Sequence, residues 1–239
     1  MGLIAGMKTI FITGASRGIG LELTKQLLTE GHKVIAGCRN PEDADALLAC
    51  RENSDHLEIM GLRVDEENSV RSCFATLEQA GRGIDLLFNN AGIIDWDDLH
   101  AISTESLEKV YRTNLVGALL VLRGAISCLR MSSDPLVVNL SSRLGSIALR
   151  GNTQLGGAIA YQCSKAALNM LTRQSAIDLS ALGIRVVSVS PGWVRTDMGG
   201  ETAKYEVDES VRLIRTALGN LQPTATGVFI GEDGETIPW

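Results

Sequence analysis

Short runs of apolar, often β-branched residues alternate along the whole chain with longer segments in which apolar residues recur at helical spacing. This alternation is typical of βαβ units, whose parallel sheet is covered by helices on both faces. We therefore predict a single doubly wound α/β domain over residues 1–239, with about seven strands. The predicted strands are Thr9–Ile12, Lys33–Cys38, Leu57–Val64, Ile84–Phe88, Leu136–Leu140, Arg185–Ser190 and Gly227–Ile230. The predicted helices are Ile19–Glu30, Ala44–Arg51, Ser69–Ala80, Leu107–Leu129, Ile159–Leu182 and Glu209–Leu218.

Length and composition agree with one globular domain. A chain of 239 residues buries most of its apolar surface around one core, and its 45% hydrophobic and 21% charged residues are close to average usage. The net charge of −6 disfavours binding to a polyanion, so we expect no nucleic-acid partner. The richest apolar run, Leu115–Leu122, is far shorter than a membrane span, so we expect no membrane partner. The opening Met1–Gly6 is too short for a secretory signal and is either an extended start or a non-native addition.

The cysteines and histidines lack the spacing of a disulfide framework or a metal site. The five cysteines are an odd number and include no CxxC pair, which favours reduced thiols in a cytoplasmic protein. The three histidines are scattered, without HExxH or His-x-His spacing, so we expect no bound metal.

A glycine-rich turn follows the first predicted strand and leads directly into a helix, with the sequence Thr13-Gly14-Ala15-Ser16-Arg17-Gly18-Ile19-Gly20. Glycine allows a tight turn and a close approach of the backbone, and a helix N-terminus presents free N–H groups to a pyrophosphate. Glycine-rich runs also occur in ordinary connections. The place of this one, in the first strand-to-helix turn, favours the dinucleotide site of a Rossmann-type fold. Its predicted residues are Gly14, Ser16, Arg17, Gly18, Ile19 and Gly20.

The second predicted strand indicates which dinucleotide the site prefers. A fold that binds NAD usually carries an acidic residue at the end of this strand, where it holds the ribose diol. Here the strand ends in Cys38 and Arg39, and no acid occurs before Glu42. Arg39, helped by Arg17, is suited to bind the 2′-phosphate of NADP(H) through a planar and permanently charged guanidinium. The alternative is that both arginines are only solvated surface charges.

Tyr161 and Lys165 lie four residues apart at the start of a predicted helix and therefore share one face. A nearby ammonium favours the phenolate, so we expect the pKa of Tyr161 to be lowered toward neutrality. Such pairs are frequent by chance. Ser142, however, follows the fifth predicted strand, at the edge where ligands bind in open α/β sheets. The segment between these residues, Arg143–Ala158, is predicted to be a glycine-rich loop that forms one wall of the substrate site.

Several motifs in one order resemble the short-chain dehydrogenase/reductase family over nearly the whole chain. They are the glycine turn, Asn89-Asn90-Ala91-Gly92, Asn114, Ser142, Tyr161-x-x-x-Lys165 and Pro191-Gly192. The resemblance implies Tyr161 as general acid/base and Lys165 as the partner of the phenol and of the cofactor ribose. It further implies Ser142 as substrate orienter and Asn114 as organiser of a proton-relay water. Further cofactor contacts are implied for Asp65, Asn89, Ala91, Gly92, Pro191, Gly192, Val194 and Thr196.

Three segments are similar to sniffer-type carbonyl reductases and C-factor-like proteins within that family. They are Ser142–Ser146, Pro191–Gly200 and Asp233–Trp239. The resemblance implies hydride transfer between NADP(H) and an aldehyde, ketone or quinone, in either direction, with Tyr161 exchanging the proton. It also leaves a second interpretation open, in which a regulatory protein binds NADP(H) and turns over only incidentally.

Five apolar residues near these motifs are candidates for contact with a moderately hydrophobic carbonyl substrate, although such residues more often belong to a core or an interface. They are Trp96, Leu144, Ile147, Trp193 and Met198. The family resemblance also implies self-association. We expect a homodimer or homotetramer built on the predicted helices Leu107–Leu129 and Ile159–Leu182.

Overall fold

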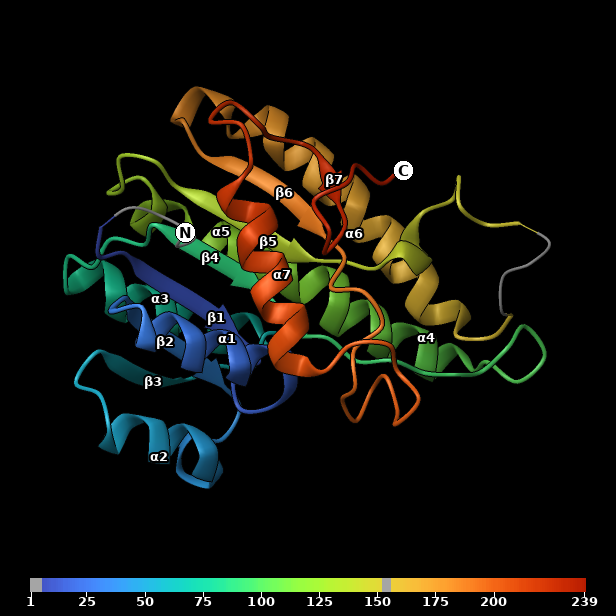
Figure 1. The fold of residues 1–239 in the computed structure, drawn as a ribbon, viewed down its shortest axis with the longest axis horizontal. Coiled ribbons are helices and arrows are strands. Elements are labelled where there is room, and N and C mark those ends of the chain that lie inside the picture. The colour runs from blue at the N-terminus through green and yellow to red at the C-terminus, as the bar shows by residue number, and fades with distance from the viewer. Residues whose placement is uncertain (1–5, 152–155) are drawn as a thin grey trace.

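A seven-stranded sheet with the order β3-β2-β1-β4-β5-β6-β7 lies at the centre of the computed structural model, which describes residues 6–151 and 156–239 (Figure 1). Every neighbouring pair of strands is parallel. The predicted doubly wound α/β fold is therefore confirmed. The strands are β1 (Thr9–Thr13), β2 (Lys33–Cys38), β3 (Leu57–Gly61), β4 (Leu86–Asn89), β5 (Leu136–Leu140), β6 (Arg185–Val189) and β7 (Phe229–Ile230).

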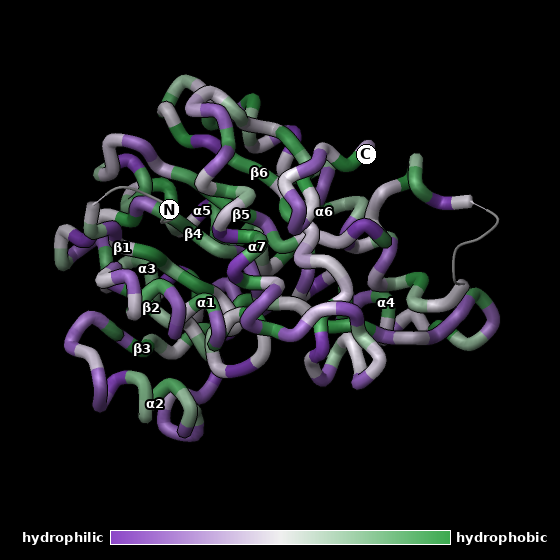
Figure 2. Tube along the Cα trace, viewed as in Figure 1, coloured by the Kyte–Doolittle hydropathy of each residue, from purple (hydrophilic) through white to green (hydrophobic). Residues whose placement is uncertain are grey.

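Helices cover both faces of the sheet because successive strand residues point to opposite sides. Ile10 and Ile12 of β1 pack in one apolar cluster with residues of α1 and α7, whereas Phe11 packs in the other with residues of α3, α5 and α6. The ring of Phe11 lies 5.0 Å from that of Phe74 on α3. Figure 2 shows the strands as hydrophobic segments between these layers. The helices are α1 (Gly18–Thr29), α2 (Asp45–Glu52), α3 (Glu67–Gln79), α4 (Thr104–Tyr111), α5 (Gly117–Leu129), α6 (Ile159–Asp178) and α7 (Val207–Gly219).

Several predicted boundaries differ from those of the structure. The third strand ends at Gly61 and not at Val64, because the chain turns after Leu62, where Glu66 N bonds to Arg63 O. The last strand has two residues instead of four. The predicted helix Leu107–Leu129 begins earlier, since the Ser103 side chain caps the first turn of α4 by accepting a hydrogen bond from Ser106 N. A π-helical turn, Arg112–Val116, joins α4 to α5.

Among the described residues, one helical stretch, Thr104–Leu129, is long and apolar enough to cross a membrane by length and composition alone. Half of its most apolar window is buried inside the molecule. A core helix of a soluble protein meets the same criteria, so this stretch carries no membrane assignment.

The topology places the carboxyl ends of the central strands at one edge of the sheet. The chain runs from β1 outward to β2 and β3, and then returns to β4 on the other side of β1. The strand order therefore reverses between β1 and β4, and ligands of open α/β sheets bind at the carboxyl ends of the strands beside such a reversal. The glycine turn and the segments that follow β4, β5 and β6 meet at this edge.

Candidate active site

The glycine turn is packed so closely at Gly14 and Gly20 that a side chain does not fit at these two positions. Gly14 and Gly18 have positive φ values of 65° and 51°. A Cβ atom on Gly14 would lie 2.9 Å from the Cα of Ala91, and one on Gly20 would lie 2.4 Å from the carbonyl oxygen of Gly14. The turn is therefore a backbone surface packed against the segment after β4, as the predicted phosphate site requires.

Asn90 connects the glycine turn to the segment after β4. Its Nδ2 donates to the carbonyl oxygens of Thr13 at 2.8 Å and Gly14 at 3.1 Å. In return, the hydroxyl oxygen of Thr13 accepts hydrogen bonds from the backbone N–H groups of Asn90 and Ala91, both at 3.0 Å. The sequence analysis quoted Asn90 within a motif but gave it no role. The only feature of the sequence that could have indicated this role is that Asn90 is the second amide of the pair Asn89-Asn90.

The N-terminus of α1 is open to a ligand. Arg17 occupies the N-cap position and its side chain makes no hydrogen bond to the first turn. The exposed guanidinium of Arg17 instead pairs with Asp197, with 3.1 Å between Nη1 and Oδ2. The methyl group of Thr196 would lie 3.4 Å from a Cβ on Gly18, so the segment after β6 reaches the glycine turn. The structure thus brings Thr196 to the predicted pyrophosphate site.

Arg39 and Asp65 lie at the same edge of the sheet. Arg39 directly follows β2 and is exposed, and none of the ion pairs within residues 6–151 and 156–239 involves it. Asp65 follows β3, and its carbonyl oxygen accepts a hydrogen bond of 2.8 Å from Arg112 Nε. Ser16 is exposed in the glycine turn, near the start of α1.

The predicted catalytic residues come together where β5 and α6 meet. Tyr161 and Lys165 lie one turn apart at the start of α6, and both are buried. The hydroxyl of Ser142 is hydrogen-bonded to that of Tyr161. Lys165 Nζ lies 5.5 Å from the centroid of the Tyr161 ring and donates to the carbonyl oxygen of Leu140 at 2.6 Å.

The structure contradicts the expected direction of the Tyr161 pKa. Burial raises the pKa of Tyr161 to about 12, and the hydrogen bond from Ser142 only partly opposes this rise. Burial also lowers the pKa of Lys165 to about 8. The expectation failed because the ammonium bonds to the Leu140 carbonyl and not to the phenol, so desolvation dominates. Tyr161 therefore holds its proton and is suited to donate it.

Asn114 holds the segment after β4 against α6. Its Oδ1 accepts a hydrogen bond from Ile93 N at 2.8 Å, and its Nδ2 donates to Ile93 O at 2.9 Å and to Ser164 Oγ at 3.0 Å. The side-chain amide is thus already hydrogen-bonded within the protein, and the water-organising role implied for Asn114 stays a prediction. Asn114 lies in the π-helical turn, a feature frequent at functional sites. A Cβ on Gly92 would lie 3.6 Å from Lys165 Nζ, which places Gly92 beside the lysine.

The side chain of Asn89 bonds within the fold. It is buried, and its Nδ2 donates to Asn139 Oδ1 at 2.9 Å, while Asn139 Nδ2 donates to Thr172 Oγ1 at 2.8 Å. These bonds join β4, β5 and α6. The cofactor contact implied for Asn89 stays a prediction.

Three of the five predicted substrate residues, Trp96, Ile147 and Trp193, are exposed by more than half, whereas Leu144 and Met198 are half-buried. The Trp193 indole donates to Gly199 O at 2.7 Å, which holds the segment after β6 in a closed loop with Val194 buried.

Of the predicted loop Arg143–Ala158, residues 152–155 lie outside the described part of the chain. Its far end packs on the segment after β4, because Ala158 N donates to Trp96 O at 3.2 Å.

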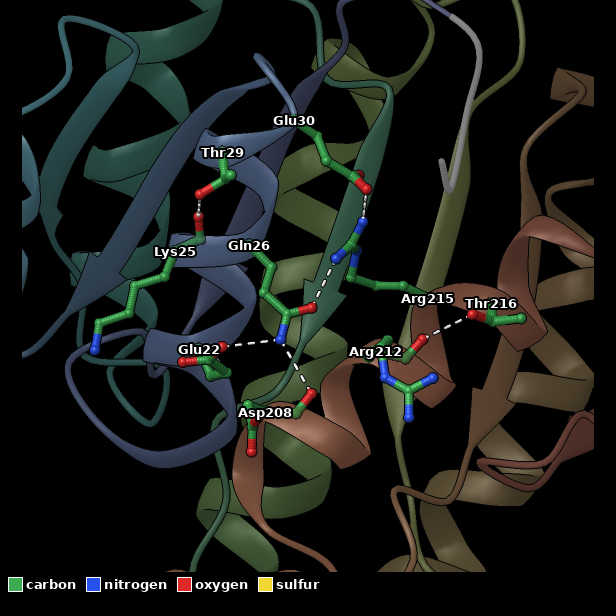
Figure 3. Close-up of a pocket in the computed structure, with 9 residues that line it drawn as sticks. All are labelled: Glu22, Lys25, Gln26, Thr29, Glu30, Asp208, Arg212, Arg215 and Thr216. Atoms are coloured by element: carbon green, nitrogen blue, oxygen red, sulfur yellow. Dashed lines mark hydrogen bonds and ion pairs between the residues drawn. The ribbon is translucent and has the colours of Figure 1, made fainter. Parts of the chain in front are cut away.

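A groove of about 620 Å³ between α1 and α7 contains none of the predicted site residues (Figure 3). Arg215 on one side of it is already bonded within the protein, because it pairs with Glu30 and its Nη1 donates to Gln26 Oε1 at 2.6 Å. We assign it no ligand. Within the described residues, no group of three or more His, Cys, Asp or Glu side chains is placed to hold a metal ion.

Comparison with known proteins gives consistent matches over most of the chain. The sequence model of the short chain dehydrogenase family matches residues 8–206. The chain is 38% identical over 157 residues to the C-signal of Myxococcus xanthus, which covers 65% of this chain and 93% of that protein. The fold superposes on the NADPH-bound carbonyl reductase from chicken fatty liver with a TM-score of 0.93 and 34% identity, over 98% of this chain and 99% of that one. For the carbonyl reductase Sniffer of D. melanogaster the TM-score is 0.91 and the identity 32%, over 98% and 100% of the two chains.

Proposed function

The chain belongs to the short-chain dehydrogenase/reductase family, as its motifs predicted, and we propose that it is an NADP(H)-dependent reductase of small carbonyl compounds. The observation that carries this proposal is the group formed by Ser142, Tyr161 and Lys165 at the carboxyl edge of the sheet. A buried phenol whose pKa is raised to about 12 stays protonated at neutral pH, as a proton donor for carbonyl reduction must.

The residues at the sheet edge fit NADP(H). The uncapped N-terminus of α1 and the glycine turn, whose Gly14 and Gly20 leave no room for a side chain, would hold the pyrophosphate. Arg39, with no acidic residue at the end of β2, would bind the 2′-phosphate, helped by Arg17. The segment Pro191–Thr196 would border the nicotinamide. The chicken fatty liver relative is an NADPH-bound carbonyl reductase, which supports this assignment.

The mechanism assigns one task to each catalytic residue. Bound NADPH supplies the hydride that reduces the carbonyl carbon. Tyr161 donates its proton to the carbonyl oxygen as negative charge develops there, and Ser142 orients that oxygen by a hydrogen bond. Lys165, whose ammonium lies 5.5 Å from the centroid of the Tyr161 ring, would bind the cofactor ribose and stabilise the phenolate left after proton transfer. Trp96, Leu144, Ile147, Trp193 and Met198 would favour a moderately hydrophobic aldehyde, ketone or quinone.

The relative named C-signal motivates a second candidate, an NADP(H)-binding regulatory protein with incidental turnover. The complete set of Ser142, Tyr161 and Lys165 favours the enzyme. A panel of aldehydes, ketones and quinones, assayed for NADPH oxidation beside a measurement of NADPH binding, distinguishes the two. Tight NADPH binding without turnover of any compound would favour regulation, and absence of NADPH binding would refute both.

We further propose that the protein acts in the cytoplasm as a homodimer or homotetramer, without membrane or nucleic-acid partners. The odd number of cysteines and the lack of a CxxC pair support the compartment. Light scattering after size-exclusion chromatography tests the oligomeric state.

A further inference from the structure

Residues 231–239, here called the 231–239 segment, fold back on β7. Gly231 N donates to Glu235 O at 2.8 Å, and Ile237 N donates to Phe229 O at 2.8 Å. The buried side chain of Ile237 and the ring of Trp239, stacked 5.5 Å from that of Phe229, fix the segment on the sheet. It is thus an ordered part of the fold.

The 231–239 segment also binds the chain that leaves Ser142. Ser146 Oγ donates to Pro238 O at 2.5 Å, and Ala148 N donates to Trp239 O at 2.9 Å. The guanidinium of Arg143, the residue after Ser142, contacts both Glu232 and Asp233. Two motifs that the sequence analysis noted separately, Ser142–Ser146 and Asp233–Trp239, therefore form one contact in the folded protein.

The two carboxylates that Arg143 contacts differ in burial. Arg143 Nη2 lies 3.0 Å from Asp233 Oδ2 and 3.5 Å from Glu232 Oε2, but the Asp233 side chain is 43% exposed and that of Glu232 only 6%. Water and salt screen the shorter, exposed pair, so it contributes little. A buried carboxylate depends on its protein partner, because removal of that partner leaves an uncompensated charge. Burial therefore makes Glu232 the carboxylate that fixes Arg143.

Glu232 touches the opposite side of the site as well. A Cβ on Gly192 would lie 3.0 Å from the carboxyl carbon of Glu232 and 2.8 Å from the ring of Tyr205. Gly192, at a φ of 79°, follows Pro191 in the segment assigned to the nicotinamide. Glu232 is thus packed between the residue after Ser142 and the residue after Pro191.

We propose that Glu232 is a positioning residue, which acts through Arg143 and Gly192. It holds Ser142 at a fixed position relative to the segment Pro191–Thr196, which is assigned to the nicotinamide. The inference rests on the proposed reductase function. A hydrogen bond to the substrate oxygen stabilises the transition state, in which that oxygen gains negative charge, more than it stabilises the bound substrate. Loss of the Glu232 charge is therefore expected to lower kcat more than it raises KM.

The test compares Glu232→Gln, which keeps the shape and removes the charge, with the matched control Asp233→Asn. In Glu232→Gln we expect kcat for carbonyl reduction to fall by about tenfold or more, with the carbonyl KM and the NADPH Kd changed less than about threefold. Asp233→Asn should stay within about twofold of wild type, and Glu232→Asp should recover part of the lost kcat. Hydrogen–deuterium exchange of the NADPH-bound proteins should show faster exchange over residues 144–148 in Glu232→Gln alone.

Equal kcat values and equal exchange in Glu232→Gln and Asp233→Asn would overturn the proposal, as would a larger loss in Asp233→Asn. If Glu232→Gln does not fold, Glu232→Asp decides: wild-type kcat and wild-type exchange over residues 144–148 in that variant would also overturn it. If the wild-type protein reduces no carbonyl compound, the proposed function fails, while the exchange comparison still decides whether Glu232 holds the Ser142 segment.

Discussion

The buried ammonium of Lys165 predicts a pH dependence of stability that one substitution isolates. Burial lowers the pKa of Lys165 from 10.5 to about 8, which corresponds to a cost of about 3 kcal/mol in the folded protein wherever both states are protonated. As pH rises above 8, the folded protein loses this proton while the unfolded chain keeps it until about 10.5. The unfolded state then binds more protons, so stability rises with pH. About 2 kcal/mol of the cost should be relieved between pH 7 and pH 9.5.

The measurement is urea unfolding of the wild-type protein and of Lys165→Met, without cofactor, at several pH values from 7 to 9.5. The substitution also removes the bond to Leu140 O, but that loss does not depend on pH, and folded Tyr161, whose pKa burial raises to about 12, keeps its proton over this range. The free energy of unfolding of wild type minus that of the variant should therefore increase by about 2 kcal/mol across the range. A difference that stays constant within about 0.5 kcal/mol, or that decreases, would refute the lowered pKa of Lys165.

Three further substitutions test the site. Tyr161→Phe removes only the transferable proton, so kcat should fall by about 10²-fold or more while the NADPH Kd stays within a few fold; activity within about tenfold of wild type would reject Tyr161 as the acid. Arg39→Asp should erase the preference for NADPH over NADH, since charge-assisted hydrogen bonds contribute about 1.5–3 kcal/mol; equal kcat/KM values for the two cofactors in the wild-type protein would contradict this assignment. Gly20→Ala should abolish NADPH binding, because its Cβ would lie 2.4 Å from the Gly14 carbonyl oxygen. The matched control is Gly151→Ala, where no atom other than those of the chain neighbours lies within 4 Å of the added Cβ. Wild-type NADPH affinity in Gly20→Ala would show that the turn can shift.

The prediction of the fold succeeded where the pattern was long and regular. The alternation of Ile10, Phe11 and Ile12 between the two apolar clusters follows directly from the period of a strand. The end of β3 was wrong because the apolar residues Leu62 and Val64 follow its last residue, Gly61, and the start of β7 was wrong because the apolar Val228 precedes its first residue, Phe229. The spacing of apolar residues did not indicate the π-helical turn that joins α4 to α5.

Candidate site residues were found where a motif combines local geometry with chemistry. The glycine turn and the pair Tyr161 and Lys165 lie within single elements, so spacing along the chain was sufficient to align them. The pKa of Tyr161 was expected in the wrong direction. Its value depends on burial and on the Leu140 carbonyl that takes the ammonium, and neither is visible in a four-residue spacing.

The sequence by itself determined the class of fold, the family and the candidates for hydride-transfer chemistry, because all three follow from local periodicity and short motifs. Only the tertiary structure decided what those residues face. In the folded chain, Asn89 donates a hydrogen bond to Asn139 on the neighbouring strand, and Asn90 donates one to Thr13 O beside the glycine turn. Glu232 contacts Arg143, which lies 89 residues away along the chain. The physical reason is that burial and hydrogen-bond partners arise from segments that meet only when the sheet closes, and these two quantities set the protonation and the orientation of the catalytic groups.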